Sequence, residues 1–134
     1  MSKSALADNS TIFESNNLTI RGNSAGSGGG IYAANNSTSS QFTGLVVNEN
    51  SAVEGGGIYL TNAHIGVGGG EINNNVATEQ DGGAIYLIND SHFYSMGNDD
   101  YQPLLISGNT SFGKGGGIYV DSSHVSLIKS GLIK

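Results

Sequence analysis

The 134-residue chain contains no cysteine, no tryptophan and only one proline, and it is poor in charge. The absence of cysteine excludes disulfides, thiolate chemistry and cysteine-ligated zinc. Five basic residues against 11 acidic ones give a net charge of -6, which argues against a nucleic-acid surface or a polybasic membrane patch. No apolar run approaches the roughly 20 residues of a membrane span. We therefore expect no nucleic-acid partner and no membrane span in this chain.

The start of the chain, MSKSALADNS, lacks the apolar region of a signal peptide. If the protein is secreted, we therefore expect this chain to be a fragment or an excised domain.

Glycine, serine and asparagine are abundant, with 22, 18 and 15 copies. Glycine and asparagine are poor helix formers, and serine prefers caps and turns. Leucine, isoleucine, valine and phenylalanine nevertheless make up 32 of the 134 residues, which is above the roughly 20% typical of disordered chains. The composition is therefore compatible with a folded β-protein if these apolar residues are placed regularly.

A five-residue motif repeats along the chain. Gly-Gly-Gly-Ile-Tyr occupies 28–32, 55–59 and 115–119, and Gly-Gly-Ala-Ile-Tyr occupies 82–86. The motif isoleucines are separated by 27, 27 and 33 residues. An aliphatic residue, two spacers and an asparagine precede each motif, and these asparagines are Asn23, Asn50, Asn75 and Asn109. A period near 27 without helical spacing is typical of a β-solenoid.

We predict an all-β, right-handed parallel β-helix of about four to five coils with three short strands per coil, because parallel crossovers are right-handed. The first strand of each coil is the Ile-Tyr segment. The second is expected near 41–43, 64–67, 92–96 and 124–128, and the third near 18–21, 45–48, 71–73 and 104–107. The expected domain limits are a polar N-terminal cap or tail at 1–11, repeats at 12–128 with an inserted loop at 97–103, and a truncated end with an open edge at 129–134.

Alternation along the first strand predicts which residues face the core. Ile31, Ile58, Ile85 and Ile118 should form an inner ladder, with Ala33, Leu60, Leu87 and Val120 two residues further on. Tyr32, Tyr59, Tyr86 and Tyr119 should point outward. The residues before each isoleucine should form a tight turn with close backbone approach; they include Gly29, Gly30, Gly56, Gly57, Gly83, Ala84, Gly116 and Gly117. Asn35, Asn62 and Asn89 should adopt left-handed conformations and bond to the next coil as a corner ladder.

Three sets of residues are candidates for chemistry. The outward tyrosines are either an exposed platform for a sugar or a protein, or a ladder that only stabilises neighbouring coils. Gln41, His64, His92 and His124 are expected to align as a solvated polar face, with metal binding or a pH response as the alternatives. Asp99 and Asp100 in the inserted loop are the carboxylates that an enzyme would use. No base and carboxylates converge on one coil position, so we predict no catalytic residue, no metal site and no cofactor.

The paired motifs resemble the repeats of chlamydial polymorphic membrane proteins, which alternate Gly-Gly-Ala-Ile and Phe-x-x-Asn. Gly82-Gly83-Ala84-Ile85 matches the first motif literally, and Phe13-Glu14-Ser15-Asn16 matches the second. The resemblance covers roughly residues 12–128. It implies a right-handed parallel β-helix in an autotransporter passenger, displayed on the bacterial outer-membrane surface or extracellularly, with a role in adhesion to host cells.

We therefore expect a non-enzymatic surface module in a larger secreted or autotransported protein, with a host-cell receptor or surface glycan as partner. Two alternatives stay open. The chain is otherwise a fragment of a β-helix carbohydrate-active enzyme or tailspike-like polysaccharide binder, or a purely structural spacer. The open ends of the solenoid should favour self-association.

Overall fold

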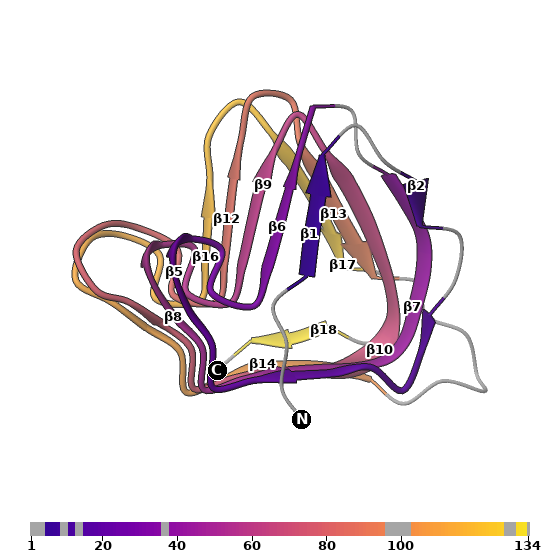
Figure 1. Ribbon diagram of the computed structural model, residues 1–134, viewed down its shortest axis with the longest axis horizontal. Helices are drawn as coiled ribbons and strands as arrows, with labels where there is room; N and C mark the ends of the chain where they lie inside the picture. The colour runs from indigo at the N-terminus through magenta and orange to yellow at the C-terminus, as the bar shows by residue number, and fades with distance from the viewer. Residues whose placement is uncertain are drawn as a thin grey trace.

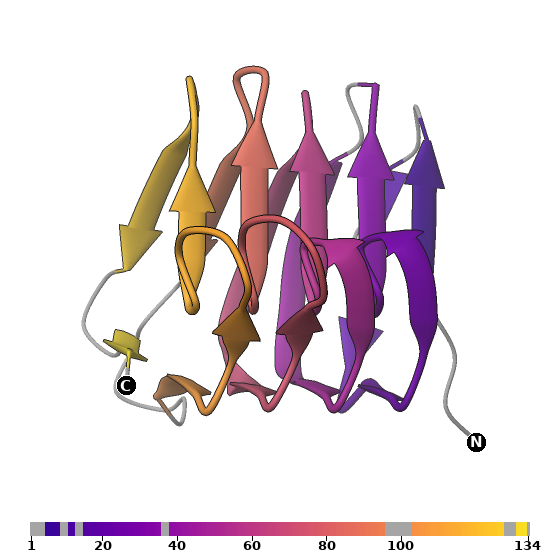
Figure 2. The same ribbon diagram turned by 90° about the vertical axis from the view of Figure 1, so that its left-hand side faces the viewer.

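The computed structural model describes residues 5–8, 11–12, 15–35, 38–95, 103–127 and 131–133. Within these ranges every regular element is a strand, and the strands pair in parallel. The chain is the predicted right-handed parallel β-helix, and its coils form three stacked sheets. Figure 1 looks along the solenoid, and Figure 2 shows equivalent strands of successive coils lying side by side.

The first sheet contains the Ile-Tyr strands in the predicted register. Its order is β1 (Ala5–Asp8), β6 (Ile31–Ala34), β9 (Ile58–Thr61), β12 (Ile85–Ile88) and β16 (Ile118–Val120). Ile58 pairs with Ile31 on one side and with Ile85 on the other, and Ile85 pairs with Ile118. β1 lies within the stretch 1–11 and pairs with β6 through Ala5 and Ile31. Because the motif repeats along the sequence, equivalent residues of successive coils lie directly beside one another.

The second sheet corrects the prediction of separate second and third strands. β7 (Thr38–Asn48) and β10 (His64–Asn73) each run continuously through both predicted positions. They bend around one corner of the coil without leaving the sheet (Figure 1). In the coils before β7 and after β10, separate shorter strands occupy the same path. The remaining strands are β2 (Thr11–Ile12), β3 (Ser15–Asn16), β4 (Thr19–Arg21), β13 (His92–Ser95), β14 (Leu104–Ser107), β17 (His124–Leu127) and β18 (Gly131–Ile133).

The third sheet was missed by the sequence analysis. It consists of β5 (Ser24–Ser27), β8 (Ser51–Glu54), β11 (Val76–Ala77) and β15 (Thr110–Ser111). After the asparagine of each repeat the chain leaves the coil along this sheet and returns through the glycine-rich turn. We call this projection, residues 24–30, 51–57, 76–84 and 110–117, the arm. It projects at the left of Figure 1, beside the first sheet.

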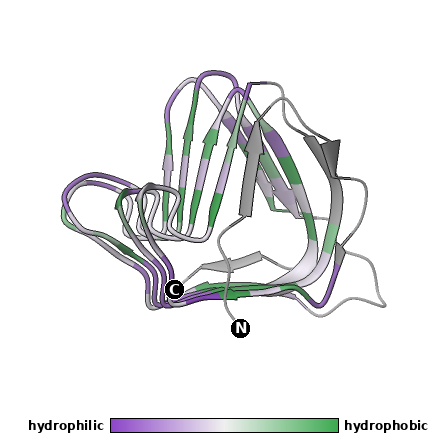
Figure 3. Ribbon diagram, in the orientation of Figure 1, coloured by the Kyte–Doolittle hydropathy of each residue, from purple (hydrophilic) through white to green (hydrophobic). Residues whose placement is uncertain are grey.

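The core is one column of aliphatic side chains with two phenylalanines. Ile58, Leu60, Ile85 and Leu87 are each fully buried, as are Phe93 and Ile106. Figure 3 shows hydrophobic residues recurring at matching places on successive coils. Val120 departs from the predicted inner ladder, because its side chain is 43% exposed. It lies on β16, which is the edge strand of the first sheet, so no described strand covers it.

The corners use left-handed backbone where the sequence places glycine and asparagine. The first glycine of each turn has a positive φ; for Gly28, Gly55, Gly82 and Gly115 it lies between 60° and 71°. Asn35, Asn62 and Asn89 have φ values of 55°, 52° and 57°. They bond to the neighbouring coil as predicted: the backbone N–H groups of Asn35 and Asn62 donate to the Thr61 and Ile88 carbonyls (3.3 Å each), and the Asn89 side-chain amide donates to the Thr61 hydroxyl (2.9 Å).

Replacing a core leucine tests the interior ladder. Leu87→Ala removes a fully buried side chain between two covering coils, and we expect a loss of about 2–5 kcal/mol in the free energy of unfolding. Val120→Ala alters the equivalent position of the exposed last strand and should cost less than about 1 kcal/mol. Urea denaturation of both variants measures the difference. Equal losses would indicate that the two positions are equally buried, which would contradict the structure.

The predicted inserted loop lies mostly outside the described residues, which resume at Pro103. Strand β14 begins at Leu104, directly after this proline, in agreement with the expectation that Pro103 precedes the strand because it cannot donate to the ladder. At the C-terminal end, β18 pairs with β14 through Ile106 and Ile133. In the described part of the chain there is no helix long and apolar enough to cross a membrane.

Candidate functional site: the tyrosine groove beside the arm

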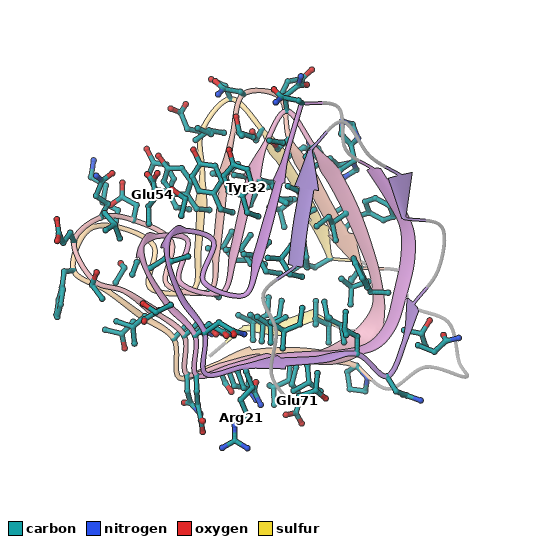
Figure 4. The ribbon with its side chains drawn as sticks, in the orientation of Figure 1. Arg21, Tyr32, Glu54 and Glu71 are labelled. Carbon is teal, nitrogen blue, oxygen red and sulfur yellow. The ribbon has the colours of Figure 1, made fainter. Side chains whose placement is uncertain are left out.

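The four motif tyrosines form a continuous stack along the solenoid. Neighbouring ring centroids are 5.3, 5.2 and 4.9 Å apart in the order Tyr32, Tyr59, Tyr86 and Tyr119, and adjacent planes differ by only 5°, 12° and 9°. The stack results from the strand register, because each tyrosine pairs directly with the next. The rings lie in the angle between the first sheet and the arm. Figure 4 shows Tyr32 pointing toward Glu54 on the arm.

The predicted exposure of these tyrosines is corrected by the structure, because their rings are largely covered. Tyr59 is only 9% exposed, and the other three are half-buried. Because the planes are nearly parallel to one another, each inner ring has both faces covered by its neighbours. The stack therefore does not offer a series of open aromatic faces for sugar rings. Ligand binding by the tyrosines stays a prediction.

Burial and nearby carboxylates raise the pKa of two of the four tyrosines, Tyr59 and Tyr86. Burial raises the pKa of Tyr59 to about 12, and the negative charge of Glu54 adds to the effect. Burial and then Glu54 also raise the pKa of Tyr86, with further contributions from Tyr119, Asp81 and Asp121. Glu54 accepts a hydrogen bond of 2.9 Å from the Ser27 hydroxyl of the preceding coil. The name tyrosine groove denotes the set formed by the four stacked tyrosines, Glu54 and Asp81, and implies no cavity.

Asp81 and the following turn connect the arms of neighbouring coils. The backbone N–H of Lys114 donates to the Asp81 carboxylate, and the N–H of Gly82 donates to the Lys114 carbonyl (3.0 Å). The arms beside the tyrosine stack are therefore joined to one another by hydrogen bonds between coils. Phe112, at the end of the last described arm, is 74% exposed.

The asparagines of the aliphatic-x-x-Asn motif form a second ladder at the corner between the second and third sheets. The side-chain amide of Asn75 donates to the Val47 carbonyl (2.8 Å) and to the Asn109 side-chain oxygen (3.0 Å). Its own oxygen accepts the backbone N–H and the side-chain amide of Asn50, each at 3.0 Å. Asn23 and Asn50 repeat the pattern one coil earlier. Asn50 and Asn75 are buried, so these amides hold the corner rather than face a ligand.

The three histidines align along the solenoid as expected, with their rings edge to face, but Gln41 requires a correction. His64 pairs with His92, and His92 pairs with His124; the ring centroids are 6.0 and 4.9 Å apart. Gln41 does not align with them, because the register partner of His64 is Thr38. The register shifts between Ile65 and Val67, where β7 holds one more residue than β10, and a spacing count along the sequence misses such a bulge. One ring nitrogen of His92 lies 3.3 Å from the Ser126 hydroxyl.

Acidification should lower the stability that the aligned histidines contribute. Burial lowers the pKa of His92, and the neighbouring His124 and His64 lower it further. The folded protein therefore binds this proton less readily than the unfolded chain, whose histidine pKa is about 6.5. The contribution to stability is present above that value and is lost as the pH falls through the lower folded-state pKa. We expect the melting temperature to drop between about pH 7 and about pH 5, and to drop less in His92→Gln. An equal drop in both proteins would contradict this assignment.

A separate hollow of about 550 Å³ lies on the outer side of the second sheet, near its corner. It is lined by Gly68–Gly70, Thr43, Glu71 and Pro103, among others. Asp99 and Asp100 lie outside the described residues. Within the ranges that are described, no group of three or more His, Cys, Asp or Glu side chains is arranged to hold a metal ion. Arg21 and Glu49 form an exposed ion pair (3.0 Å) on the same outer face.

These features define a repeat-built parallel β-helix in which the arm, the tyrosine stack and the asparagine ladder recur once per coil. Two segments, 17–34 and 103–121, match the Chlamydia polymorphic membrane protein repeat. Both segments contain the same elements: the strand before the asparagine, the arm, the glycine turn and the Ile-Tyr strand. The chain thus carries the polymorphic membrane protein-type repeat. No curated protein and no solved structure matches the chain significantly.

The unmatched coils between the two segments have the same construction. β8 and β9 continue the sheets of β5 and β6, and β11 and β12 continue them again. The unmatched residues 82–85 carry the literal Gly-Gly-Ala-Ile motif, whereas the two matched segments have glycine in place of its alanine, at Gly30 and Gly117. The literal Phe-x-x-Asn copy begins at Phe13 and Glu14, which lie outside the described residues.

Proposed function

We propose that this chain is a non-enzymatic module of a larger bacterial surface protein and that it acts in adhesion to host cells. The observation that supports this most strongly is the polymorphic membrane protein-type repeat at two equivalent places in the solenoid. A rigid stack of coils suits display, because each coil adds a copy of the same outer surface at a fixed spacing of about 4.8 Å.

We propose the tyrosine groove as the adhesive surface. Its ring faces are covered, so the groups available to a partner are the hydroxyl edges of the tyrosines and the carboxylates of Glu54 and Asp81. These groups would hydrogen-bond to a protein receptor or to the hydroxyls of a surface glycan. The contact would be polar and repeated along the coil axis, and it would use no cofactor.

Cell binding by matched variants tests the proposal. In one variant Tyr32, Tyr59, Tyr86 and Tyr119 are all changed to Phe, which keeps the ring stack and removes the hydroxyls. In the control, Arg21→Gln with Glu49→Gln alters the opposite outer face, where Figure 4 places Arg21, without changing the net charge. We expect the tyrosine variant to bind cultured host cells at least about tenfold more weakly, since each lost hydrogen bond costs roughly 0.5–1.5 kcal/mol. The control should bind like the wild-type chain.

The outcomes separate the candidate functions. Equal binding by both variants would remove the groove from the proposal, and absence of binding by the wild-type chain would overturn adhesion for this module. The latter result would favour the structural spacer, for which the face-to-face tyrosine stack is the specific supporting observation. Product formation with any member of a polysaccharide panel would contradict the non-enzymatic assignment. Treating the cells with glycosidases would distinguish a glycan partner from a protein receptor.

A further inference from the structure

We infer that the tyrosine stack is a site of oxidative cross-linking, at which a one-electron oxidant joins tyrosines of adjacent coils into dityrosine. Three neighbouring pairs have ring centroids within 5.3 Å and planes within 12° of parallel. The pairs are in strand register, so neighbouring rings present equivalent edges on the same side of the sheet. A dityrosine bond joins the ring carbons ortho to the two hydroxyls.

The chemistry needs an oxidant and no other group. Each tyrosine of a pair loses one electron and one proton and becomes a phenoxyl radical. The two radicals form a carbon–carbon bond between their ortho carbons, and the hydrogens on those carbons move to the oxygens, which restores both phenols. The product has lost two hydrogen atoms in all. Hydrogen peroxide, acting through a haem peroxidase, accepts them and is reduced to two molecules of water.

The stack favours coupling within one chain. Holding two reacting groups side by side gives effective concentrations far above those of separate molecules in solution. Tyr94 provides an internal comparison outside the stack, because its ring lies against the His92 ring with the centroids 5.0 Å apart. Buried Tyr59 does not need direct contact with the oxidant, since its half-buried neighbours can be oxidised first and exchange an electron with it through the stack.

The cross-link would fasten one coil to the next. Tyr59 and Tyr86 are separated by 27 residues in the sequence, so a bond between them closes a loop and restricts the unfolded chain, as a disulfide does. The chain has no cysteine, so disulfides cannot fulfil this role. An oxidising extracellular environment would therefore stabilise the solenoid through its tyrosines.

Two double variants with the same number of substitutions provide the test. Within the stack, Tyr59→Phe with Tyr119→Phe leaves Tyr32 and Tyr86, which are two coils apart. Tyr32→Phe with Tyr59→Phe leaves the stack tyrosines Tyr86 and Tyr119, which are adjacent at 4.9 Å. Each chain, at low micromolar concentration, is treated with a haem peroxidase and hydrogen peroxide. Intact mass, biphenol fluorescence and peptide mapping then report the products, and circular dichroism confirms that both variants are folded.

We expect the wild-type chain and the adjacent-pair variant to give a monomer lighter by two hydrogen atoms, with the bond mapped between stacked tyrosines. The separated-pair variant should give no bond between its two stack tyrosines in the folded state. The cross-linked wild-type chain should also unfold at a higher denaturant concentration. Equal yields from the two variants, bonds mapped mainly to Tyr94, or covalent dimers as the main product would each overturn the inference.

Discussion

Gly56→Ala is expected to destabilise the solenoid by more than about 4 kcal/mol, which would be among the largest effects of any single substitution. The φ of Gly56 is not positive, so the reason is space alone. An added Cβ would lie 2.5 Å from the Val76 carbonyl oxygen and 2.6 Å from the Gly83 carbonyl oxygen. Both contacts are with backbone of the next coil, which cannot rotate away. The coils would have to separate and lose hydrogen bonds such as Gly56 N–H to the Gly82 carbonyl (3.1 Å).

Gly26→Ala is the matched control for this prediction. Gly26 lies on β5 of an outer arm, its φ is not positive, and a Cβ there would meet nothing within 4 Å. We expect a change of less than about 1 kcal/mol, in either direction. Guanidinium denaturation followed by circular dichroism measures both variants. Similar stability of the two would show that the glycine turn does not require close backbone approach.

Asn75→Ala is expected to cost about 3 kcal/mol or more. The side chain is fully buried and makes four hydrogen bonds, to Val47, Asn109 and, twice, Asn50. Its removal leaves buried donors and acceptors without partners, and each such group costs roughly 1–3 kcal/mol. A substitution in one coil should therefore weaken both neighbouring coils.

Asn73→Ala controls for the loss of an asparagine in the same coil. Asn73 is half-buried on the outer face, where its amide donates to Glu71 at 3.1 Å and its side-chain oxygen accepts from the Ser107 hydroxyl at 3.0 Å. We expect a loss below about 1 kcal/mol, because water can replace these partly exposed contacts. Native-state hydrogen exchange should show faster exchange at the Asn50 and Thr110 amides in Asn75→Ala only. Unchanged exchange there would contradict a ladder that joins coils.

The parts of the fold that were predicted from sequence are those in which identical or similar residues of successive coils pair with one another. The Ile-Tyr strand recurs almost unchanged, so the register of Ile58 on Ile31 and Ile85 follows from the repeat itself. The left-handed corners were also accessible, because glycine and asparagine adopt that conformation at low cost.

The third sheet was not predictable in the same way. Its strands have two to four residues and include Ser24–Ser27, which has neither an apolar alternation nor a β-branched side chain. They are extended because backbone bonds to the next arm hold them, for example Ser51 N–H to the Asn23 carbonyl (2.9 Å). This cause lies in the neighbouring coil and leaves little trace in the local sequence.

The sequence predicted the location of the candidate site, but it did not predict how far the tyrosine rings are covered. Alternation placed the four tyrosines on the outer side of the first sheet, yet the arm folds beside them and the register turns their faces toward one another. The position of Gln41 failed for a related reason, since the shift between Ile65 and Val67 has no sequence signature that a count of spacings detects.

Pairwise cysteine cross-linking is the most direct test of the claim that each repeat stacks in register on the next. The chain has no cysteine of its own. Val46 and Glu71 are register partners in adjacent coils, and Leu105 is the partner of Glu71 one coil further. Neighbouring strands lie about 4.8 Å apart, within the range of Cα distances that a disulfide spans.

On mild oxidation, Val46→Cys with Glu71→Cys should form an intramolecular disulfide, detected by thiol titration and mapped by mass spectrometry. Val46→Cys with Leu105→Cys, whose positions are two coils apart, should keep both thiols free. A disulfide in the second pair and not in the first would contradict the stacking of repeats on which the arm, the tyrosine groove and the asparagine ladder all depend.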